Sequence, residues 1–330
     1  MRRRDFIAGL GGTATWPFLA RAQQDSPVKR IGLLQNTGES DPESKAELAT
    51  LAQELKKLGW VEGDNLQITY RYGGGDPNSM ALAAKELVAL QPDLLFARST
   101  AAVHAMVRET KTIPILFIAV SDPVGEGFAA SLSRPGRNIT GFTNVESSVA
   151  GKWVELLKEV APGTTQIEFI FNPQTAPSQG KYYSSLVEHA ADHFAVKTFA
   201  HPLRSAGDIE SAFDPFARRP GAGLIVLPDP FTVTHRKSII DLALRNRLPA
   251  VYAFRNMVVE GGLIAYGVNP LDLYRRSSSY IDRILKGEKA GDLAIQAPVK
   301  FDLIVNLKTA KAMGLKIPET FLLLADDVIE

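Results

Sequence analysis

The feature of this chain that most constrains its fold is a regular alternation of short apolar runs with stretches of helical periodicity. Residues 30–36, 93–97 and 115–119 are such runs, and segments such as 79–90 and 101–109 between them have helical spacing of apolar residues. Runs that are apolar on both faces are typical of parallel strands covered by helices on both sides. The sequence therefore predicts an α/β fold with parallel sheets.

The stretch after residue 41 illustrates how these helices are encoded. Asp41 can cap a helix N-terminus, and Pro42 fits the first turn. Four leucines follow at spacings of three, four and three residues: Leu48, Leu51, Leu55 and Leu58. Gly59 is suited to end the helix. We expect this helix to pack on a sheet through its leucine stripe.

The spacing of the elements favours two similar lobes over one large sheet. About four strand–helix units precede residue 142 and four more follow it, and 330 residues is a typical length for two domains. A strand at 262–266, a helix at 271–285 and a strand at 299–305 remain after the second set. These extra elements indicate that the chain crosses back between the lobes.

The first 22 residues have the order of an export signal. Arg3 and Arg4 precede an apolar, Gly- and Ala-rich stretch, and Ala20 and Ala22 are small residues suited to a cleavage site. The arginine spacing resembles a twin-arginine signal, and we expect cleavage near Ala22 and a periplasmic location. An N-terminal helix of the fold is disfavoured by Gly9, Gly11, Gly12 and Pro17.

Composition excludes several classes of function. The chain has no cysteine, which removes disulfides, cysteine zinc sites, iron–sulfur clusters and a thiol nucleophile. Loss of residues 1–22 removes four arginines and one aspartate, so the formal net charge changes from +1 to −2. Nothing in this balance resembles the excess of cations that nucleic-acid binding requires, so no nucleic-acid partner is predicted.

Small polar residues directly follow most of the predicted strands. Ligands of open parallel sheets bind beyond the carboxyl ends of the strands, so these positions are the candidates for a binding site. The predicted ligand-binding residues are Asn36, Thr37, Ser99, Thr100, Asp122, Asn172, Asp229 and Phe254.

Their chemistry suits a small polar solute. Ser99 and Thr100 stand at the start of a predicted helix, where hydroxyl and N–H groups can hold a carboxylate. Asp122 and Asp229 can neutralise an ammonium group, and Phe254 can form an apolar wall. Each residue also has a structural alternative, because Ser, Thr, Asn and Asp are common helix caps and turn formers and aromatic side chains are usually buried.

Signals for catalysis are weak. The chain has no phosphate-binding Walker loop and no GxSxG nucleophile motif. His189 and His193 have helical metal-ligand spacing but lack the glutamate of an HExxH motif, and nothing places Asp122 and Asp229 at one reacting centre. We therefore predict no enzyme activity, no metal site and no cofactor.

Several motifs resemble the periplasmic substrate-binding components of ABC transporters, in the group related to tryptophan and tyrosine uptake proteins. The matching segments are 58–65 (LGWVEGDN), 112–115 (TIPI), 121–125 (SDPVG), 132–141 (LSRPGRNITG), 265–267 (AYG), 284–289 (ILKGEK), 306–311 (NLKTAK), 314–315 (GL) and 325–330 (ADDVIE). The resemblance covers residues 28–330.

The resemblance implies a type I periplasmic-binding fold, with two doubly wound parallel-sheet lobes joined by three crossovers. We expect these near Gly141, Gly262 and Gly291, so that residues 23–141 and 262–291 form lobe 1 and residues 142–261 and 292–330 form lobe 2. It also implies a monomer that closes by a hinge on a small organic solute and delivers it to an ABC permease with its ATPase.

An amino acid, with aromatic ones favoured, is the ligand class that the resemblance implies, and a purine or another small acid is an alternative. Similar proteins carry a Gly/Thr-rich turn after the third strand, whereas this chain has Arg98-Ser99 there. Two other functions stay open at this point. One is a ligand-sensing module for a signalling partner, and the other is an enzyme on a doubly wound scaffold.

Overall fold

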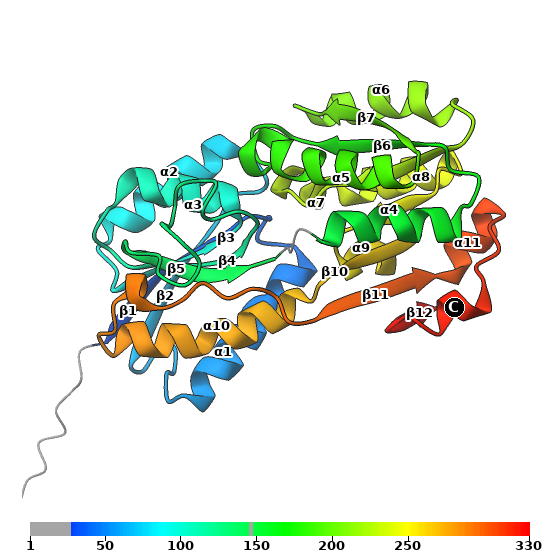
Figure 1. Cartoon of the computed structure of the whole chain (residues 1–330). Helices are drawn as coiled ribbons and strands as arrows, with labels where there is room; N and C mark the ends of the chain where they lie inside the picture. The colour runs from blue at the N-terminus through cyan, green and yellow to red at the C-terminus, as the bar shows by residue number, and fades with distance from the viewer. Residues whose placement is uncertain (1–27, 145–147) are drawn as a thin grey trace, which may run out of the picture.

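The computed structural model describes residues 28–144 and 148–330 (Figure 1). The predicted signal peptide, residues 1–22, lies outside the described residues. Among the helices that are described, none is both long enough and apolar enough to cross a membrane.

Lobe 1, in the described part of the chain, is built on a five-stranded parallel sheet with the order β2-β1-β3-β4-β5. The strands are β1 (Lys29–Gln35), β2 (Leu66–Tyr72), β3 (Leu94–Arg98), β4 (Ile115–Val120) and β5 (Ile139–Thr143). Helices α1 (Pro42–Lys57) and α10 (Pro270–Leu285) cover one face, and α2 (Pro77–Ala89) and α3 (Thr100–Glu109) cover the other (Figure 1).

Lobe 2, within the same ranges, has a seven-stranded sheet with the order β12-β11-β10-β9-β8-β6-β7. The strands are β6 (Gln166–Phe171), β7 (Lys197–Pro202), β8 (Ala222–Val226), β9 (Ala250–Tyr252), β10 (Ile264–Val268), β11 (Phe301–Asn306) and β12 (Asp327–Ile329). One face is covered by α4 (Ser148–Val160), α5 (Lys181–His193), α11 (Leu307–Met313) and α12 (Glu319–Leu322). The other face is covered by α6 (Ala206–Ala217), α7 (Pro230–Thr234), α8 (Arg236–Arg245) and α9 (Arg255–Val259).

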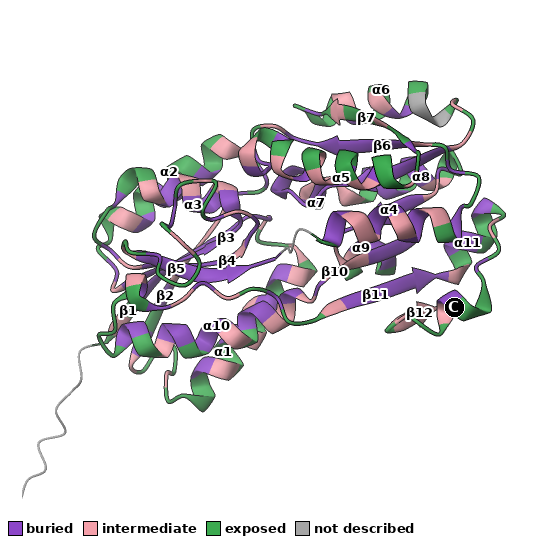
Figure 2. Cartoon of the chain, in the orientation of Figure 1, coloured by how far each residue is buried: buried purple, intermediate pink, exposed green. Residues whose placement is uncertain are grey.

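The predicted α/β class with two helix-covered parallel sheets is confirmed. The strands are mostly buried, while the outer faces of the helices are exposed (Figure 2). One pairing departs from the parallel pattern, because β11 runs antiparallel to β10 with Val268 opposite Phe301. The chain re-enters lobe 2 at the end of the sheet where β10 ends, so the next strand must run in the opposite direction.

The chain passes between the lobes three times, the first close to the predicted Gly141 and the other two a few residues beyond the predicted glycines. The first passage follows Thr143, because Gly141 lies within β5. The second follows Val268 rather than Gly262, because β10 pairs with β9 and β11 in lobe 2. The third follows Gln296 rather than Gly291, since Gln296 still bridges to Phe142 of lobe 1. The assignment of the remaining segments to lobes stays a prediction.

Local sequence signals explain most element boundaries. Asp41 caps α1 by accepting a 3.0 Å hydrogen bond from the Ser44 backbone N–H, as the sequence predicts. A short 3-10 turn, η1 (Pro177–Gly180), precedes α5, and within it Ser178 and Gln179 have left-handed φ of 48° and 58°. A separate short helix, α7, ends at Thr234 directly before α8 begins at Arg236.

Close packing at the second passage gives a test of the fold. A Cβ on Gly267 of β10 would lie 1.9 Å from the Ala253 carbonyl oxygen, so Gly267→Ala must push β10 away from β9. We expect a loss of about 1–3 kcal/mol in the free energy of unfolding, measured by urea denaturation. Gly151→Ala in α4, where a Cβ meets nothing within 4 Å, should gain about 0.5–1 kcal/mol instead. Equal effects of the two variants would contradict this packing.

Candidate functional site

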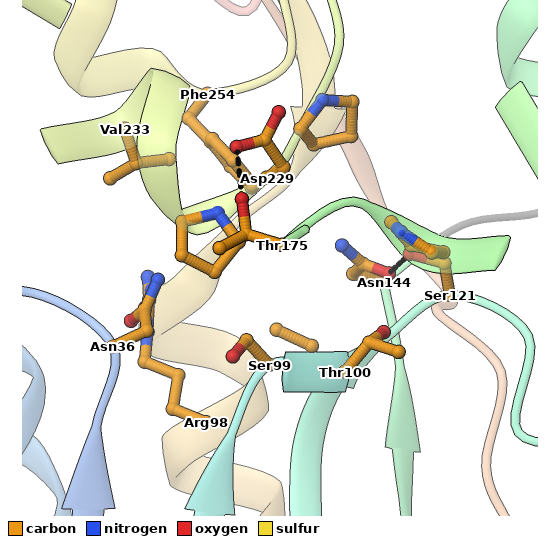
Figure 3. A pocket seen from close by; sticks show the side chains of 14 residues that line it. Asn36, Arg98, Ser99, Thr100, Ser121, Asn144, Thr175, Asp229, Val233 and Phe254 are labelled. Atoms are coloured by element: carbon orange, nitrogen blue, oxygen red, sulfur yellow. Dashed lines mark hydrogen bonds between the residues drawn. The ribbon is translucent and has the colours of Figure 1, made fainter. Parts of the chain in front are cut away.

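A cavity lies between the lobes, where the carboxyl ends of strands from both sheets meet (Figure 3). Lobe 1 contributes Asn36, Arg98, Ser99, Thr100, Ala119, Ser121 and Asn144, and lobe 2 contributes Thr175, Pro177, Pro228, Asp229, Pro230, Val233 and Phe254. The cavity volume is about 20 Å³, which is room for about one water. A larger solute therefore enters only when the lobes or the lining side chains move apart.

The structure brings five of the eight predicted ligand-binding residues to this cavity. These are Asn36, Ser99, Thr100, Asp229 and Phe254. They come from the ends of β1, β3, β8 and β9, so the positions beyond the carboxyl ends of these parallel strands meet at one cavity. Their contact with a ligand stays a prediction.

Three predicted residues do not line the cavity. The Thr37 hydroxyl pairs with the Ser44 hydroxyl of α1. Asp122 folds back on its own turn and accepts a 2.8 Å hydrogen bond from the Gly125 backbone N–H. Asn172 accepts a 2.7 Å hydrogen bond from the Gln174 backbone N–H. Asp122 and Asn172 take the turn-forming alternative, which the sequence could not separate from ligand binding.

Other lining residues were missed by the sequence analysis. Asn144 follows β5, a strand that the periodicity did not reveal, and Thr175 lies several residues beyond β6. Ser121 directly follows β4 and could have been found by the same rule as its neighbour Asp122. Its hydroxyl pairs with Asn144 at 3.1 Å and with the Tyr183 hydroxyl of lobe 2 at 2.6 Å.

Arg98 forms part of the lobe 1 side of the cavity through a buried network. Its Nη2 donates to Glu47 Oε1 at 2.6 Å and its Nη1 donates to Asn36 Oδ1 at 2.5 Å. Burial raises the pKa of Glu47, and the guanidinium opposes that rise. Arg98 is thus neither a surface group nor an inter-lobe ion pair, because both partners belong to lobe 1.

Asp229 forms the opposite side of the cavity and organises the start of α7. Its Oδ1 accepts hydrogen bonds from the Thr175 hydroxyl at 3.0 Å and from the backbone N–H groups of Phe231 and Thr232 at 2.8 and 3.0 Å. Its Oδ2 accepts from the Asn172 backbone N–H at 3.1 Å. Burial raises the pKa of Asp229 to about 6, and these hydrogen bonds limit the rise.

Backbone strain is concentrated at the cavity. Ser99 has φ of 100° and ψ of 157°, a combination that is rare for residues with a side chain. Ala119 has φ of 56° at a shift in the pairing of β4 with β5. Both residues line the cavity, so the surrounding packing holds this part of the site in one conformation.

Substitutions at Ser99 test the strain. Ser99→Gly removes an unfavourable φ that costs about 1–3 kcal/mol and adds up to about 1 kcal/mol of chain entropy, so we expect unchanged or higher stability. Ser99→Ala keeps the strain and loses the hydrogen bond from the Ala102 N–H, so it should lower stability by about 1 kcal/mol. The Tm of each variant, compared with that of the wild type, measures these effects. A glycine variant less stable than the wild type would contradict the strain at Ser99.

Polar contacts join the lobes around the cavity. Arg236 of α8 forms a 2.9 Å ion pair with Asp41, and Asn256 of α9 donates to Glu43 of α1. On another side, Glu126 of lobe 1 accepts hydrogen bonds from the Ser178 N–H at 2.5 Å and from its hydroxyl at 3.0 Å. These contacts exist only while the lobes lie together.

Glu43 is a titratable group of this interface with a raised pKa. Burial raises its pKa from 4.5 to about 7, with Glu47 and Asp41 adding to the rise and Arg98 and Arg236 opposing it. The folded protein therefore holds this proton to a higher pH than the unfolded chain does.

A pH series tests this assignment. Between about pH 4.5 and 7 the folded state binds more protons at Glu43 than the unfolded state, so this group lowers stability as pH rises through that window. Glu43→Gln should therefore lose less stability than the wild type between pH 5 and 7, as measured by Tm. Glu54→Gln, on the same helix, serves as the control. Identical slopes for Glu43→Gln and wild type would refute the assignment.

In the part of the chain that the structure describes, no three or more His, Cys, Asp or Glu side chains are grouped so as to hold a metal ion.

The profile of the ABC transporter substrate binding protein family matches residues 28–329. The chain belongs to this family. A curated relative is the tyrosine-binding protein of Clostridioides difficile, which is 26% identical over 263 residues, covering 79% of this chain and 74% of that protein. The protein is therefore a solute-binding protein of the ABC transporter type.

Solved structures share the fold over nearly the whole described chain. A conserved domain protein from Vibrio cholerae is 28% identical with a TM-score of 0.85, covering 91% of this chain and 99% of that one. A domain from Streptococcus pneumonia in complex with L-Trp is 24% identical with a TM-score of 0.84, at the same coverage. A ligand-free, open substrate-binding protein from Clostridium difficile is 27% identical with a TM-score of 0.66, covering 92% and 99%. The type I periplasmic-binding fold that the sequence predicts is confirmed.

Proposed function

We propose that this protein binds an aromatic amino acid between its lobes and delivers it unchanged to an ABC permease. The observation that carries the proposal is a cavity at the strand ends to which both lobes contribute polar side chains. Family membership supports the transport role, and the tyrosine-binding relative and the L-Trp complex support the ligand class.

The lining residues have the chemistry that an amino acid requires. Serine, threonine and asparagine side chains offer hydrogen bonds, Asp229 offers a negative charge, and Phe254 offers an apolar surface. Binding sites for small molecules typically combine a few fixed polar groups with apolar walls.

Closure of the lobes is the proposed mechanism. The fold has a higher TM-score with the L-Trp complex than with the open, ligand-free protein, although the open one is the more similar in sequence. The inter-lobe contacts of Ser121, Glu126 and Asp41 also describe a closed arrangement. A solute that touches both lobes binds this arrangement better than an open one and so shifts the equilibrium towards it.

Export and partners belong to the same proposal. The twin-arginine-like signal would direct the folded chain to the periplasm, with cleavage near Ala22. There the protein would act as a monomer and meet an inner-membrane permease with its ATPase. No nucleic-acid partner and no cofactor are proposed.

A binding assay on the mature chain, residues 23–330, tests the ligand class. L-tyrosine, L-tryptophan or L-phenylalanine at 100 times its Kd should stabilise the protein by about 2.7 kcal/mol, seen as a rise in Tm. L-leucine and D-xylose serve as comparison solutes, and the ligand should be recovered chemically unchanged. Stabilisation by the sugar and by none of the three aromatic amino acids would reject the proposal, and turnover of the ligand would indicate an enzyme.

A further inference from the structure

Three consecutive glycines follow β2 on the lobe 1 side of the gap, and each has different surroundings. A Cβ on Gly73 would lie 2.4 Å from a methionine side chain of α2, in the same lobe. A Cβ on Gly74 would meet none of the described residues within 4 Å. A Cβ on Gly75 would lie 2.6 Å from Thr234 Oγ1 and 3.0 Å from the Pro230 carbonyl oxygen, and both of these residues belong to α7 of lobe 2. Of the three, Gly75 is the one whose missing side chain leaves room for the other lobe.

This contact joins the two walls of the cavity. The Gly75 N–H donates a 2.7 Å hydrogen bond to the carbonyl oxygen of Asn36, which lines the cavity from lobe 1. Pro230 and Val233 of α7 line the same cavity from lobe 2. Figure 3 shows Asn36 in the lower part of the cavity and Val233 in the upper part. The distance between the loop of residues 73–75 and α7 therefore sets the distance between the walls.

The contact lies away from two of the three passages of the chain. Strand β2 is the edge of the lobe 1 sheet opposite β5. The first passage follows β5, and the third follows Gln296, which bridges to Phe142 of β5. Gly75 is buried, whereas its neighbour Gly74 is exposed. A movement of the lobes about these passages would separate Gly75 from α7.

We propose that Gly75 sets how closely the lobes approach, because its lack of a side chain lets the loop of residues 73–75 rest directly on Thr234 and on the Pro230 carbonyl group. The inference rests on the proposed function and adds a positioning residue that is not part of the cavity lining. A side chain at position 75 raises the free energy of the closed arrangement and not that of the open one, since opening separates the two surfaces. The affinity for solute then falls although every lining side chain is kept.

Alanine variants of two neighbouring glycines test this contact on the mature chain. Gly75→Ala introduces the clash with α7. Gly74→Ala adds the same methyl group at a similar left-handed φ, 58° against 75°, where the described residues leave open space. By isothermal titration calorimetry, Gly75→Ala should raise the Kd of L-tyrosine about 5- to 150-fold, and Gly74→Ala less than about 2-fold. Equal Kd values for the two variants would overturn the proposal.

Changes at Thr234 test the lobe 2 side of the contact. Its buried hydroxyl has no hydrogen-bond partner within the described ranges, so Thr234→Ala removes the atom nearest to the new Cβ without breaking a bond. Thr234→Ala alone should bind like wild type, and combined with Gly75→Ala it should lower the Kd at least about 3-fold from that of Gly75→Ala alone. Thr234→Leu fills the same gap from lobe 2 and should weaken binding even if the Gly75→Ala chain does not fold. Unchanged binding by Thr234→Leu, or no recovery in the double variant, would contradict the contact.

Binding rates distinguish a role in closure from a general loss of structure. A solute meets the open lobes first, so a contact made on closure acts mainly on dissociation. Gly75→Ala should release radiolabelled L-tyrosine, chased with excess unlabelled L-tyrosine, faster by about the same factor as its Kd is raised. Its association rate constant should stay within about 2-fold of wild type. A slower association that accounts for the whole change in Kd would refute the role in closure.

The outcomes separate this proposal from the proposed function. If wild type binds L-tyrosine and the Gly75 and Gly74 variants bind it equally, Gly75 does not set the closure and the proposed function stands. If wild type binds L-tryptophan or L-phenylalanine instead, that amino acid replaces L-tyrosine in every measurement. If wild type binds L-leucine or D-xylose and no aromatic amino acid, the ligand class is wrong and the Kd of that solute decides the role of Gly75. If none of these solutes binds, both proposals fall.

Discussion

The buried ion pair between Arg98 and Glu47 is the interaction on which the lobe 1 side of the cavity depends. Arg98 ends β3 and Glu47 lies in α1, so their 2.6 Å contact joins the sheet to the helix that follows β1. The same guanidinium fixes Asn36 through its second nitrogen. Removing one charge would leave the other unpaired in the interior, at a cost of about 3–5 kcal/mol. A neutral side chain at position 98 therefore requires a neutral one at position 47.

Rigid backbone surrounds this polar centre on both lobes. Ser99 and Ala119 have left-handed φ on one side of the gap, and Ser178 and Gln179 have it on the other. Such conformations persist only where neighbouring packing determines them. The backbone at these four residues is therefore held in one conformation by its surroundings, which limits the entropy lost there when a solute binds.

Sequence patterns predict those residues of the candidate site that follow a recognisable strand. Asn36 and Asp229 were predicted because they follow strongly apolar strands, and strand periodicity is a local signal. Asn144 was missed because β5 contains Gly141 and two threonines and has little apolar character. The direction of a side chain after a strand is set by the following turn, and the turn at Asp122 directs its carboxylate to the Gly125 N–H instead of the cavity. The crossover at Val268 depends on long-range pairing of β10, which local periodicity does not encode.

The three passages of the chain between the lobes have a mechanical consequence. Each lobe is assembled from segments that are distant in the sequence, since β10 and β11 of lobe 2 flank α10 of lobe 1. Cutting the backbone at any single passage would leave the halves tethered by the other two. Three parallel tethers also resist twisting and sliding more than bending, so the relative motion of the halves is restricted largely to a single opening and closing coordinate.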